Sequence, residues 1–348
     1  MRIAFVINGI QTEQPRYTTM LLAWTAQRRG HEVFVLEVDC FTYFPDGSVG
    51  GQAIQPARKP PRRVDDFTAA LKERDAKRVT ISSRDLDVLF IRYNPVDELE
   101  ERPWAQIAPI GFAQLAERDG VLVLPDPVSL WNNIDKLYFQ QLPESVRPKT
   151  LITRDHQEIL RFWEGCGHKA VIKPLQGFGG SDVFLLKNDR TNLNQMVEAV
   201  TRSGYVLAQE YLPAAAAGDV RLFMLNGKPL ERDGKIALFR RVNQGDDLRS
   251  NMTAGGHPER EEVSPELLHL AEAVGPLLVR DGAFLVGLDI AGQKLMEINV
   301  ISPGGLYSAS TLNDTPFAET VVDAIERKVE YRRLYGSALS NREVACMA

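Results

Sequence analysis

Short apolar runs alternate with amphipathic stretches through the first third of the chain. The run at residues 2–8 (RIAFVIN) is typical of a buried parallel strand, and a helix pattern at 18–29 ends at Gly30. A second strand pattern at 31–38 completes a βαβ unit. Three more elements follow: a strand at 86–92, a helix at 107–118 and a strand at 121–124. The pattern therefore predicts a doubly wound parallel-sheet domain over residues 1–124.

Three other stretches of this region carry weaker signals. Residues 41–51 predict a hairpin that turns at Pro45-Asp46-Gly47. Residues 52–63 are rich in proline, arginine and lysine, which favours a solvated loop, with a binding patch as the alternative. The turn after the first strand, Asn8-Gly9-Ile10-Gln11, lacks the GxGxxG fingerprint, and this argues against a dinucleotide site there.

Beyond Pro125-Asp126-Pro127 the pattern becomes mixed and then antiparallel. The expected helices are 132–140, 155–163 with Asp155 as N-cap, 191–201, 266–280 and 316–330. The expected strands are 150–153, 170–174, 182–186, 206–212, 220–225, 228–232 and 235–242. We expect the residues after Tyr335 to form a short, polar, frayed tail.

A hairpin at residues 286–300 carries the strongest chemical signal. Glu297 and Asn299 lie two positions apart on one strand, so they share a face, and Asp289 on the partner strand is within reach of it. Two carboxylates and an amide suit magnesium, which proteins commonly share with phosphate. A surface hairpin whose polar residues face water is the alternative interpretation.

A lysine followed by a glycine-rich loop predicts an anion site. Lys173 ends an apolar strand, and the loop Gln176-Gly177-Phe178-Gly179-Gly180-Ser181 follows it. Backbone N–H groups of such a loop can approach phosphate closely, and a buried ammonium needs an anion. The order differs from a Walker A loop, since the lysine precedes the glycines. An ordinary turn is the alternative.

Two more groups of residues point to nucleotide and anion binding. The strand Gln209-Glu210-Tyr211-Leu212 offers backbone groups to an adenine edge, with Glu210 available for a ribose or amino contact; a plain core strand is the alternative. A polar belt that includes several arginines follows, made of Asp219, Arg221, Arg241, Arg249 and Asn251. The planar fork of arginine suits phosphate and carboxylate, although a single arginine is usually a solvated surface group.

Composition limits the class of partner. The chain has 348 residues, enough for two or three compact units, and a formal net charge of -5 without a basic stripe. This argues against a nucleic-acid or membrane-surface role. Cys40, Cys166 and Cys346 show neither a disulfide framework nor a zinc spacing, which indicates a reducing compartment. The first ten residues are too short for a signal peptide and no apolar run is long enough to span a membrane, so we expect a cytoplasmic protein.

The order of these motifs resembles that of the ATP-grasp ligases, and more closely that of bacterial glutathione synthetase. The motifs are Lys136, Lys173 with GFGG at 177–180, QEYL at 209–212, GDVR at 218–221, RVNQGDDLRSN at 241–251, AGG at 254–256, GLDI at 287–290 and MEINVISPGG at 296–305. The resemblance implies an N-terminal α/β domain at 1–124, a small lid domain at 125–205, a central ATP-grasp domain at 206–334 and a tail at 335–348. It also implies ATP, magnesium with manganese as an alternative, a small-molecule carboxylate, an amine, and a homo-oligomer.

The resemblance assigns roles to individual residues. Lys136 and Lys173 match the phosphate-binding lysines. Residues 209–212 match the adenine and ribose edge, with Asp219 in the same nucleotide set, and Asp289, Glu297 and Asn299 match the magnesium ligands. Arg241 and Asn251 match positions near the transferred phosphate, and Arg249 matches one near the acyl acceptor. The implied reaction joins a carboxylate to an amine through an acyl phosphate, with the glycine-rich loop excluding water.

Two segments depart from the resembling family at substrate-facing positions. Bacterial glutathione synthetases continue after Ser-Pro with Thr, a small residue and an Arg-Glu pair, whereas Gly304, Gly305, Leu306, Tyr307 and Ser308 follow Ser302-Pro303 here. Arg92-Tyr93-Asn94-Pro95 also differs from the family's Arg-Lys-Asp-Pro-Pro. We therefore expect Arg92, Arg221, Ser302, Gly304 and Gly305 to face a substrate other than the pair γ-glutamylcysteine and glycine. Authentic glutathione synthesis, and an ATP-binding module without ligase activity, are the alternatives.

Overall fold

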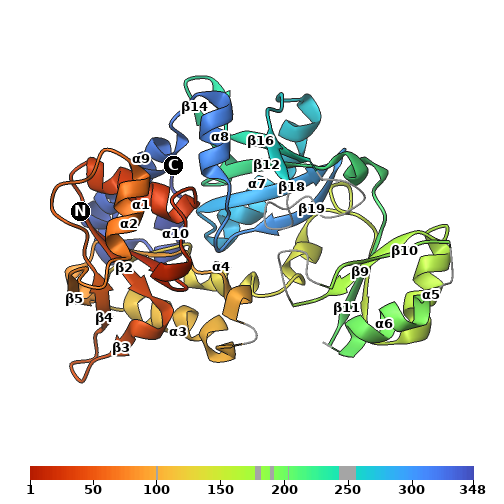
Figure 1. The fold of residues 1–348 in the computed structure, drawn as a ribbon, viewed down its shortest axis with the longest axis horizontal. Helices are drawn as coiled ribbons and strands as arrows, with labels where there is room; N and C mark the ends of the chain where they lie inside the picture. The colour runs from red at the N-terminus through yellow and green to blue at the C-terminus, as the bar shows by residue number, and fades with distance from the viewer. Residues whose placement is uncertain (99–100, 177–181, 189–191, 203, 243–255) are drawn as a thin grey trace.

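The computed structural model describes residues 1–98, 101–176, 182–188, 192–202, 204–242 and 256–348. Three β-sheets of four or more strands follow one another along the chain. The N-terminal sheet lies at one end of the molecule and the β8–β11 sheet, with its helices, lies at the other (Figure 1). This arrangement confirms the predicted α/β class with both parallel and antiparallel sheets.

The first sheet has the strand order β3-β4-β2-β1-β6-β7, with β5 paired to β4. Its parallel part comprises β1 (Arg2–Ile7), β2 (Glu32–Glu37), β6 (Val88–Ile91) and β7 (Leu122–Leu124). Its antiparallel edge comprises β3 (Phe41–Tyr43), β4 (Val49–Ile54) and β5 (Arg78–Ser82). The predicted hairpin at 41–51 is therefore confirmed, whereas β5 was not predicted from the sequence.

Helices cover both faces of this sheet because its central strand is apolar on both sides. Ile3, Phe5 and Ile7 of β1 pack with α1 (Thr18–Arg28), α2 (Val64–Leu71) and α9 (Phe317–Tyr335). Ala4 and Val6 face the opposite way, toward α3 (Ala108–Glu117) and α4 (Pro127–Asn132). Runs that are buried on both faces are typical of parallel strands.

The second sheet has the order β10-β9-β11-β8 and carries two helices. Its strands are β8 (Thr150–Thr153), β9 (Ala170–Pro174), β10 (Phe184–Leu186) and β11 (Val206–Glu210), and its helices are α5 (His156–Gly165) and α6 (Leu193–Arg202). Asp155 caps α5 as expected, since its side chain accepts a hydrogen bond from the backbone N–H of Glu158. The helices and strands enclose a separate core around Trp163.

The third sheet has the order β17-β16-β12-β18-β19, with β13 paired to β12. Its strands are β12 (Asp219–Leu225), β13 (Lys228–Pro229), β16 (Leu238–Val242), β17 (His257–Glu259), β18 (Leu285–Ala291) and β19 (Lys294–Asn299); β14 (Glu231–Arg232) and β15 (Lys235–Ile236) form a separate small ribbon. One face packs on α7 (Pro265–Asp281), where Leu222 and Leu288 meet Val274. The other face, with Phe223 and Phe239, joins the core that α9 shares with the first sheet.

Several predicted elements are corrected by the structure. The expected helix at 132–140 is wrong: α4 ends at Asn132, and a short 3-10 helix covers Tyr138–Gln141. Pro127 occupies the first turn of α4 and the side chain of Asp126 caps it, so a helix that the sequence did not predict begins at Pro125-Asp126-Pro127. Helices α2 and α8 (Leu306–Asn313) were not predicted.

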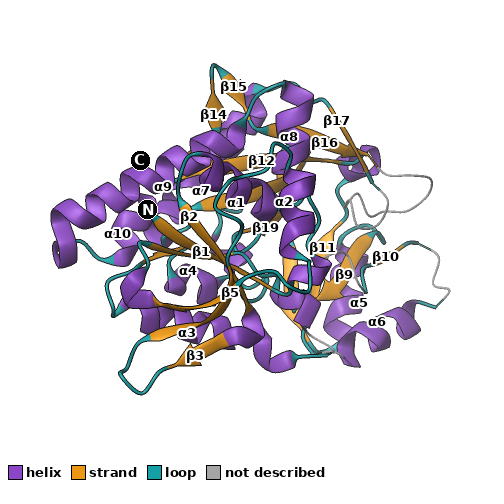
Figure 2. Cartoon of the chain, turned by 60° about the vertical axis from the view of Figure 1, so that its left-hand side comes forward, coloured by secondary structure: helices purple, strands orange, loops and turns teal. Residues whose placement is uncertain are grey.

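The C-terminal segment is also corrected, because the tail is not frayed. Helix α9 runs to Tyr335, and α10 (Asn341–Cys346) begins at a capping box formed by Ser340 and Glu343. Asn341 is 1% exposed and bonds both the N–H and the carbonyl of Val123 on β7. The end of the chain therefore lies against the N-terminal sheet (Figure 2). Among the described residues, no helix is long and apolar enough to cross a membrane.

Candidate active site

A cavity of about 800 Å³ opens where residues of all three sheets meet. The candidate site residues that the structure describes all line it: Arg92, Lys136, Lys173, Gln209, Glu210, Tyr211, Leu212, Asp219, Arg221, Arg241, Asp289, Glu297, Asn299, Ser302, Gly304 and Gly305. The remaining candidates, Gly177, Phe178, Gly179, Gly180, Arg249 and Asn251, lie outside the described residues. Residues that are as much as 213 positions apart, such as Arg92 and Gly305, thus share one space.

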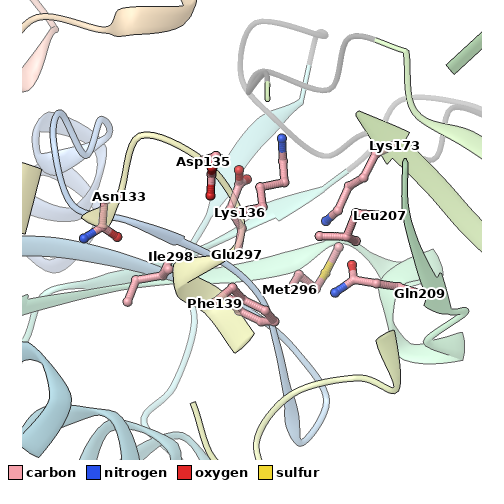
Figure 3. A pocket seen from close by; sticks show the side chains of 10 residues that line it. All are labelled: Asn133, Asp135, Lys136, Phe139, Lys173, Leu207, Gln209, Met296, Glu297 and Ile298. Carbon is pink, nitrogen blue, oxygen red and sulfur yellow. The ribbon is translucent and has the colours of Figure 1, made fainter. Parts of the chain in front are cut away.

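A narrow recess of about 20 Å³ adjoins the cavity between the second and third sheets. Its apolar walls are Phe139, Leu207, Met296 and Ile298, none of which the sequence singled out. Figure 3 shows Lys173 extending from β9 towards Gln209 and Met296. A space of this size holds about one water, so the recess is an apolar corner of the cavity beside these polar groups. The signal for these residues was weak because an apolar residue on a strand is usually core.

Two lysines and one carboxylate set the charge beside this recess. Burial lowers the pKa of Lys136 to about 8, with Lys173 pushing it further down and Glu297 opposing the shift. Burial also lowers the pKa of Lys173, against the attraction of Glu297 and Asp289. Lys136 donates to the carbonyls of Pro174 (3.1 Å) and Leu175 (3.3 Å). Neighbouring buried ammonium groups repel each other, so an anion between them would stabilise both.

The strand residues 209–212, which are predicted to bind adenine, already form hydrogen bonds with neighbouring residues. The carboxylate of Glu210 accepts from the backbone N–H of Lys149 at 2.8 Å, and the backbone N–H of Glu210 donates to the carbonyl of Lys149 at 3.1 Å. Gln209 is 5% exposed and donates to Thr150 Oγ1. The Glu210 side chain is therefore held in place by Lys149, the residue before β8, and Glu210 still lines the cavity.

Four charged residues form one buried network in the third sheet. Arg221 on β12 and Asp289 on β18 are register partners. The guanidinium donates two hydrogen bonds to the carboxylate, one from Nε to Oδ1 and one from Nη2 to Oδ2 at 2.9 Å. Arg241 lies 2.8 Å from the same Oδ2 and also pairs with Asp219. Burial alone would raise the pKa of Asp289, but Arg221 and Arg241 outweigh it and hold that pKa below its ordinary value. Asp289 is therefore a carboxylate over the ordinary pH range.

A glycine makes this arrangement fit. Gly287 lies two residues before Asp289, and a Cβ there would stand 3.0 Å from Arg221 Cδ and 3.1 Å from Pro303 Cβ. The missing side chain lets Arg221 lie across β18 and donate from Nη1 to the carbonyl of Gly304 at 2.8 Å. Arg221 thereby connects the Asp289 carboxylate to the wall of the cavity.

The predicted metal ligands have the chemistry that a divalent cation needs. Asp289 and Glu297 are register partners on β18 and β19, and Asn299 donates from Nδ2 to Asp289 Oδ2 at 3.2 Å. Asn299 Oδ1 and the Glu297 carboxylate then supply oxygens, while Asp289 Oδ1 accepts one bond, from Arg221, among the described residues. This donor set fits a hard cation such as magnesium. Asp289 differs from the other two because arginines already neutralise it.

The far end of the cavity is built around Arg92. This residue is 3% exposed and donates from Nε to Thr19 Oγ1 (3.3 Å) and from Nη2 to the carbonyl of Pro303 (3.0 Å). Ser302 Oγ donates to the carbonyl of Arg92 at 2.8 Å. The segment from Ser302 to Gly304 is therefore held by Arg92 at one end and by Arg221 at the other.

Sequence reasoning missed Glu13 at this end of the cavity. Its side chain is 7% exposed, and it follows the short 3-10 helix Ile10–Thr12. Burial raises the pKa of Glu13 to about 7, with Arg92 and Lys72 opposing the shift and Asp97 adding to it. A single glutamate in a polar loop gives no sequence signal, because most such residues are solvated.

The chain is similar to known proteins over nearly its whole length. The model of the prokaryotic glutathione synthetase N-terminal domain matches residues 1–131, and the model of the prokaryotic glutathione synthetase ATP-grasp domain matches residues 135–314. Glutathione synthetase of Gloeobacter violaceus is 33% identical over 340 residues, covering 96% of this chain and 98% of its own length. That of Thermosynechococcus vestitus is 33% identical over 328 residues, covering 92% and 98%.

Solved structures share the fold at much lower identity. A D-cycloserine synthetase aligns with a TM-score of 0.60 at 12% identity, covering 93% of this chain and all of its own. A D-alanine–D-alanine ligase of Bacillus anthracis aligns with a TM-score of 0.56 at 14% identity, covering 97% and 100%.

Proposed function

Because the chain belongs to the prokaryotic glutathione synthetase family, and is therefore an ATP-dependent, ADP-forming carbon–nitrogen ligase that uses a divalent metal ion, we propose how its own residues divide that work. The observation that carries the proposal is the single cavity that joins the lysine-lined recess, the Asp289 network and the Arg92 end. A ligase of this kind must hold nucleotide, carboxylate and amine in one space, since its main contribution is positioning.

The nucleotide occupies the end of the cavity next to the recess. The adenine ring lies in the cavity beside the strand edge at 209–212, next to Met296. Lys136 and Lys173 bind phosphate oxygens, which would relieve the repulsion between two buried ammonium groups. Glu210, held by Lys149, presents its remaining oxygen to the ribose side.

Glu297, Asn299 and Asp289 hold the metal, which we assign as magnesium, with manganese as the alternative hard cation. The bound cation would supply charge neutralisation at the β- and γ-phosphates. Arg221 keeps Asp289 ionised and in place, and Arg241 extends positive charge from Asp289 toward the site of phosphoryl transfer.

These residues support a reaction in two steps. A substrate carboxylate oxygen attacks the γ-phosphorus of ATP, the bond to the β,γ-bridging oxygen breaks, and ADP and an acyl phosphate form. The neutral amine then attacks the acyl carbon, phosphate leaves, and the amine loses a proton as the amide forms. Lys173, Lys136 and Arg241 offset the negative charge of two anions brought together. The segment Ser302–Gly305 forms the wall against which the amine lies.

We further propose that the preferred amine is bulkier or less acidic than glycine. None of the five residues after Ser302-Pro303 is an arginine, and a Cβ built on Gly304 meets nothing within 4 Å. The wall there consists of backbone, with Tyr307 and Leu312 beyond it. Without an arginine partner, a substrate carboxylate loses about 1.5–3 kcal/mol, which corresponds to roughly tenfold or more in affinity. Authentic glutathione synthesis is the alternative, in which Arg249 supplies that partner.

An ADP-release screen across acyl donors and amines tests the proposal. We expect ADP release to require both a carboxylate and an amine, and the highest kcat/KM to belong to an amine other than glycine. If γ-glutamylcysteine with glycine gives the highest kcat/KM in the panel, the acceptor assignment is wrong and the enzyme makes glutathione. ADP release that is independent of both organic substrates would contradict the ligase assignment itself.

A further inference from the structure

Arg16 differs from the other arginines of the cavity, because no acid in the described part of the chain neutralises it. Its side chain lines the cavity and is exposed, and among the described residues it forms no hydrogen bond or ion pair. The other arginines of the described cavity wall are already bonded to carboxylates, a hydroxyl or a carbonyl; they are Arg92, Arg221 and Arg241. The guanidinium of Arg16 is therefore open to an anion that enters the cavity.

The guanidinium of Arg16 is nevertheless held in one place, by an aromatic ring. Its central carbon lies 5.7 Å from the centre of the Tyr307 ring. The backbone N–H of Leu306 donates to Thr18 Oγ1 at 3.2 Å, which joins the start of α8 to the start of α1 and brings Tyr307 beside Arg16. An aromatic face attracts a guanidinium, and the N–H groups at the edge of the stacked cation stay free to bind a carboxylate.

Tyr307 belongs to the segment that follows Ser302-Pro303, against which we place the amine. Gly304 and Gly305 give that wall a backbone surface, and Tyr307 follows two residues later in the first turn of α8. Both Tyr307 and Arg16 line the same cavity as the two glycines. A cation thus lies beyond the glycine wall, on the outer side of a tyrosine that is itself only partly buried.

We propose that Arg16, supported by Tyr307, binds the carboxylate of the acceptor, and that the acceptor is an ω-amino acid in which two or more carbons separate the reacting amine from the carboxylate. This inference rests on the proposed function, because it names the class of amine that the same cavity takes. Arg16 is a specificity residue for that amine.

The length of the acceptor follows from where the cation lies. In glycine one carbon joins the amine to the carboxylate, so an amine at Gly304 would leave its carboxylate at the same backbone wall. Each further methylene group carries the carboxylate past Tyr307 toward Arg16. The orientation follows from charge, because the attacking amine must be neutral and a guanidinium attracts a carboxylate but repels an ammonium ion.

The variant Arg16→Gln tests the proposal, because it removes the charge from an exposed side chain. Steady-state ADP release is measured with the donor that works best and with four amines: glycine, β-alanine, 4-aminobutyrate and propylamine. Propylamine carries a methyl group where β-alanine carries its carboxylate. We expect the wild-type enzyme to prefer β-alanine or 4-aminobutyrate to glycine and to propylamine by about tenfold in kcat/KM. In Arg16→Gln the preference over propylamine disappears, through a higher KM of the amino acid with little change in kcat at saturation.

Arg28→Gln is the matched control. Arg28 is an exposed arginine on the same helix α1 and lies 4.8 Å from the centre of the Trp24 ring, but it does not line the cavity. The variant should keep the preference for the ω-amino acid. Tyr307→Phe keeps the ring and should also keep that preference, whereas Tyr307→Leu should reduce it about two- to fivefold because the cation loses its support.

Four results would overturn the inference: propylamine turned over as well as both ω-amino acids by the wild-type enzyme, equal losses for charged and uncharged amines in Arg16→Gln, the same loss in Arg28→Gln, or a higher KM of the donor instead of the acceptor. The ligase assignment stands in each case, since ADP release is observed. If glycine is the best amine, the acceptor assignment of the proposed function fails as well. The absence of ADP release with every donor and amine would count against the proposed function itself.

Discussion

Gly304 and Gly305 are neighbours in the wall of the cavity, but an added methyl group would meet different surroundings at each. At Gly305 the backbone φ is +97°, and a Cβ would lie 2.7 Å from Cζ and 2.9 Å from Cε1 of Phe239. At Gly304 a Cβ meets nothing within 4 Å, and φ lies outside the left-handed range. The pair therefore provides a test and its own control.

The expected cost of Gly305→Ala has two parts. A side chain in the left-handed region costs about 1–2 kcal/mol. Forcing the methyl group against the Phe239 ring, which is buried, adds about 1–3 kcal/mol of overpacking. We therefore expect a loss of roughly 2–5 kcal/mol in the free energy of unfolding. Gly304→Ala should be neutral or stabilising by up to about 1 kcal/mol, because alanine reduces the entropy of the unfolded chain.

Urea titrations of both variants measure this difference, and steady-state kinetics adds a second readout. Gly305 is the N-cap of α8, and the next residue, Leu306, donates from its backbone to Thr18 Oγ1. Gly305→Ala should therefore also reduce turnover, whereas Gly304→Ala should change only the choice of amine. Equal unfolding free energies for the two variants would refute the geometry of this wall and the acceptor assignment that depends on it.

Three further predictions follow from the site and from the C-terminal anchor. Glu297→Gln should lower ligation by roughly 100-fold with the fold intact, since the change is isosteric and removes a metal ligand; ordinary turnover at saturating magnesium would exclude that role. Lys173→Met should weaken ATP binding about tenfold or more and leave amine binding unchanged, as calorimetry can show; an unchanged ATP affinity would count against the phosphate assignment. Asn341→Ala should cost about 2–3 kcal/mol of stability in urea, because two buried backbone groups of Val123 lose their partner, whereas alanine at the neighbouring, exposed Arg342 should cost little.

The sequence predicted the parts of the site that depend on local periodicity. Alternation along residues 286–300 placed Asp289, Glu297 and Asn299 on one hairpin, and the structure pairs Asp289 with Glu297 in register. The lysine at the end of β9 was likewise visible, because a charged residue interrupts an apolar run. Their roles as ligands stay predictions.

Contacts between distant segments could not be predicted in this way. Arg221 and Asp289 meet only because β12 and β18 are neighbours in the third sheet, and no spacing between them encodes that pairing. Glu13 is buried at the end of the cavity that it shares with Arg92, which lies far from it in sequence. Helix α9 packs on the N-terminal sheet for the same reason, although its own pattern predicted only an amphipathic helix.

Helix α4 was not predicted, because the local signal at its start has two meanings. The tripeptide Pro125-Asp126-Pro127 predicts a domain boundary, and proline in a first helical turn after an aspartate is also a helix start signal. The Asp126 side chain accepts from the backbone N–H of Val128 and also from Asn341, so one residue caps the helix and anchors the C-terminus. The second contact spans 215 positions, so no local pattern could have predicted it.

The activation of a carboxylate by ATP is the central claim, and oxygen-18 transfer tests it most directly. The donor that gives the fastest ADP release is labelled with oxygen-18 in its reacting carboxylate and turned over with ATP and its amine. We predict that one carboxylate oxygen is found in the released phosphate for every amide formed, because the acyl phosphate carries that oxygen to the leaving group. Released phosphate without label, with all of the donor oxygen retained in the amide and in solvent, would contradict phosphoryl activation.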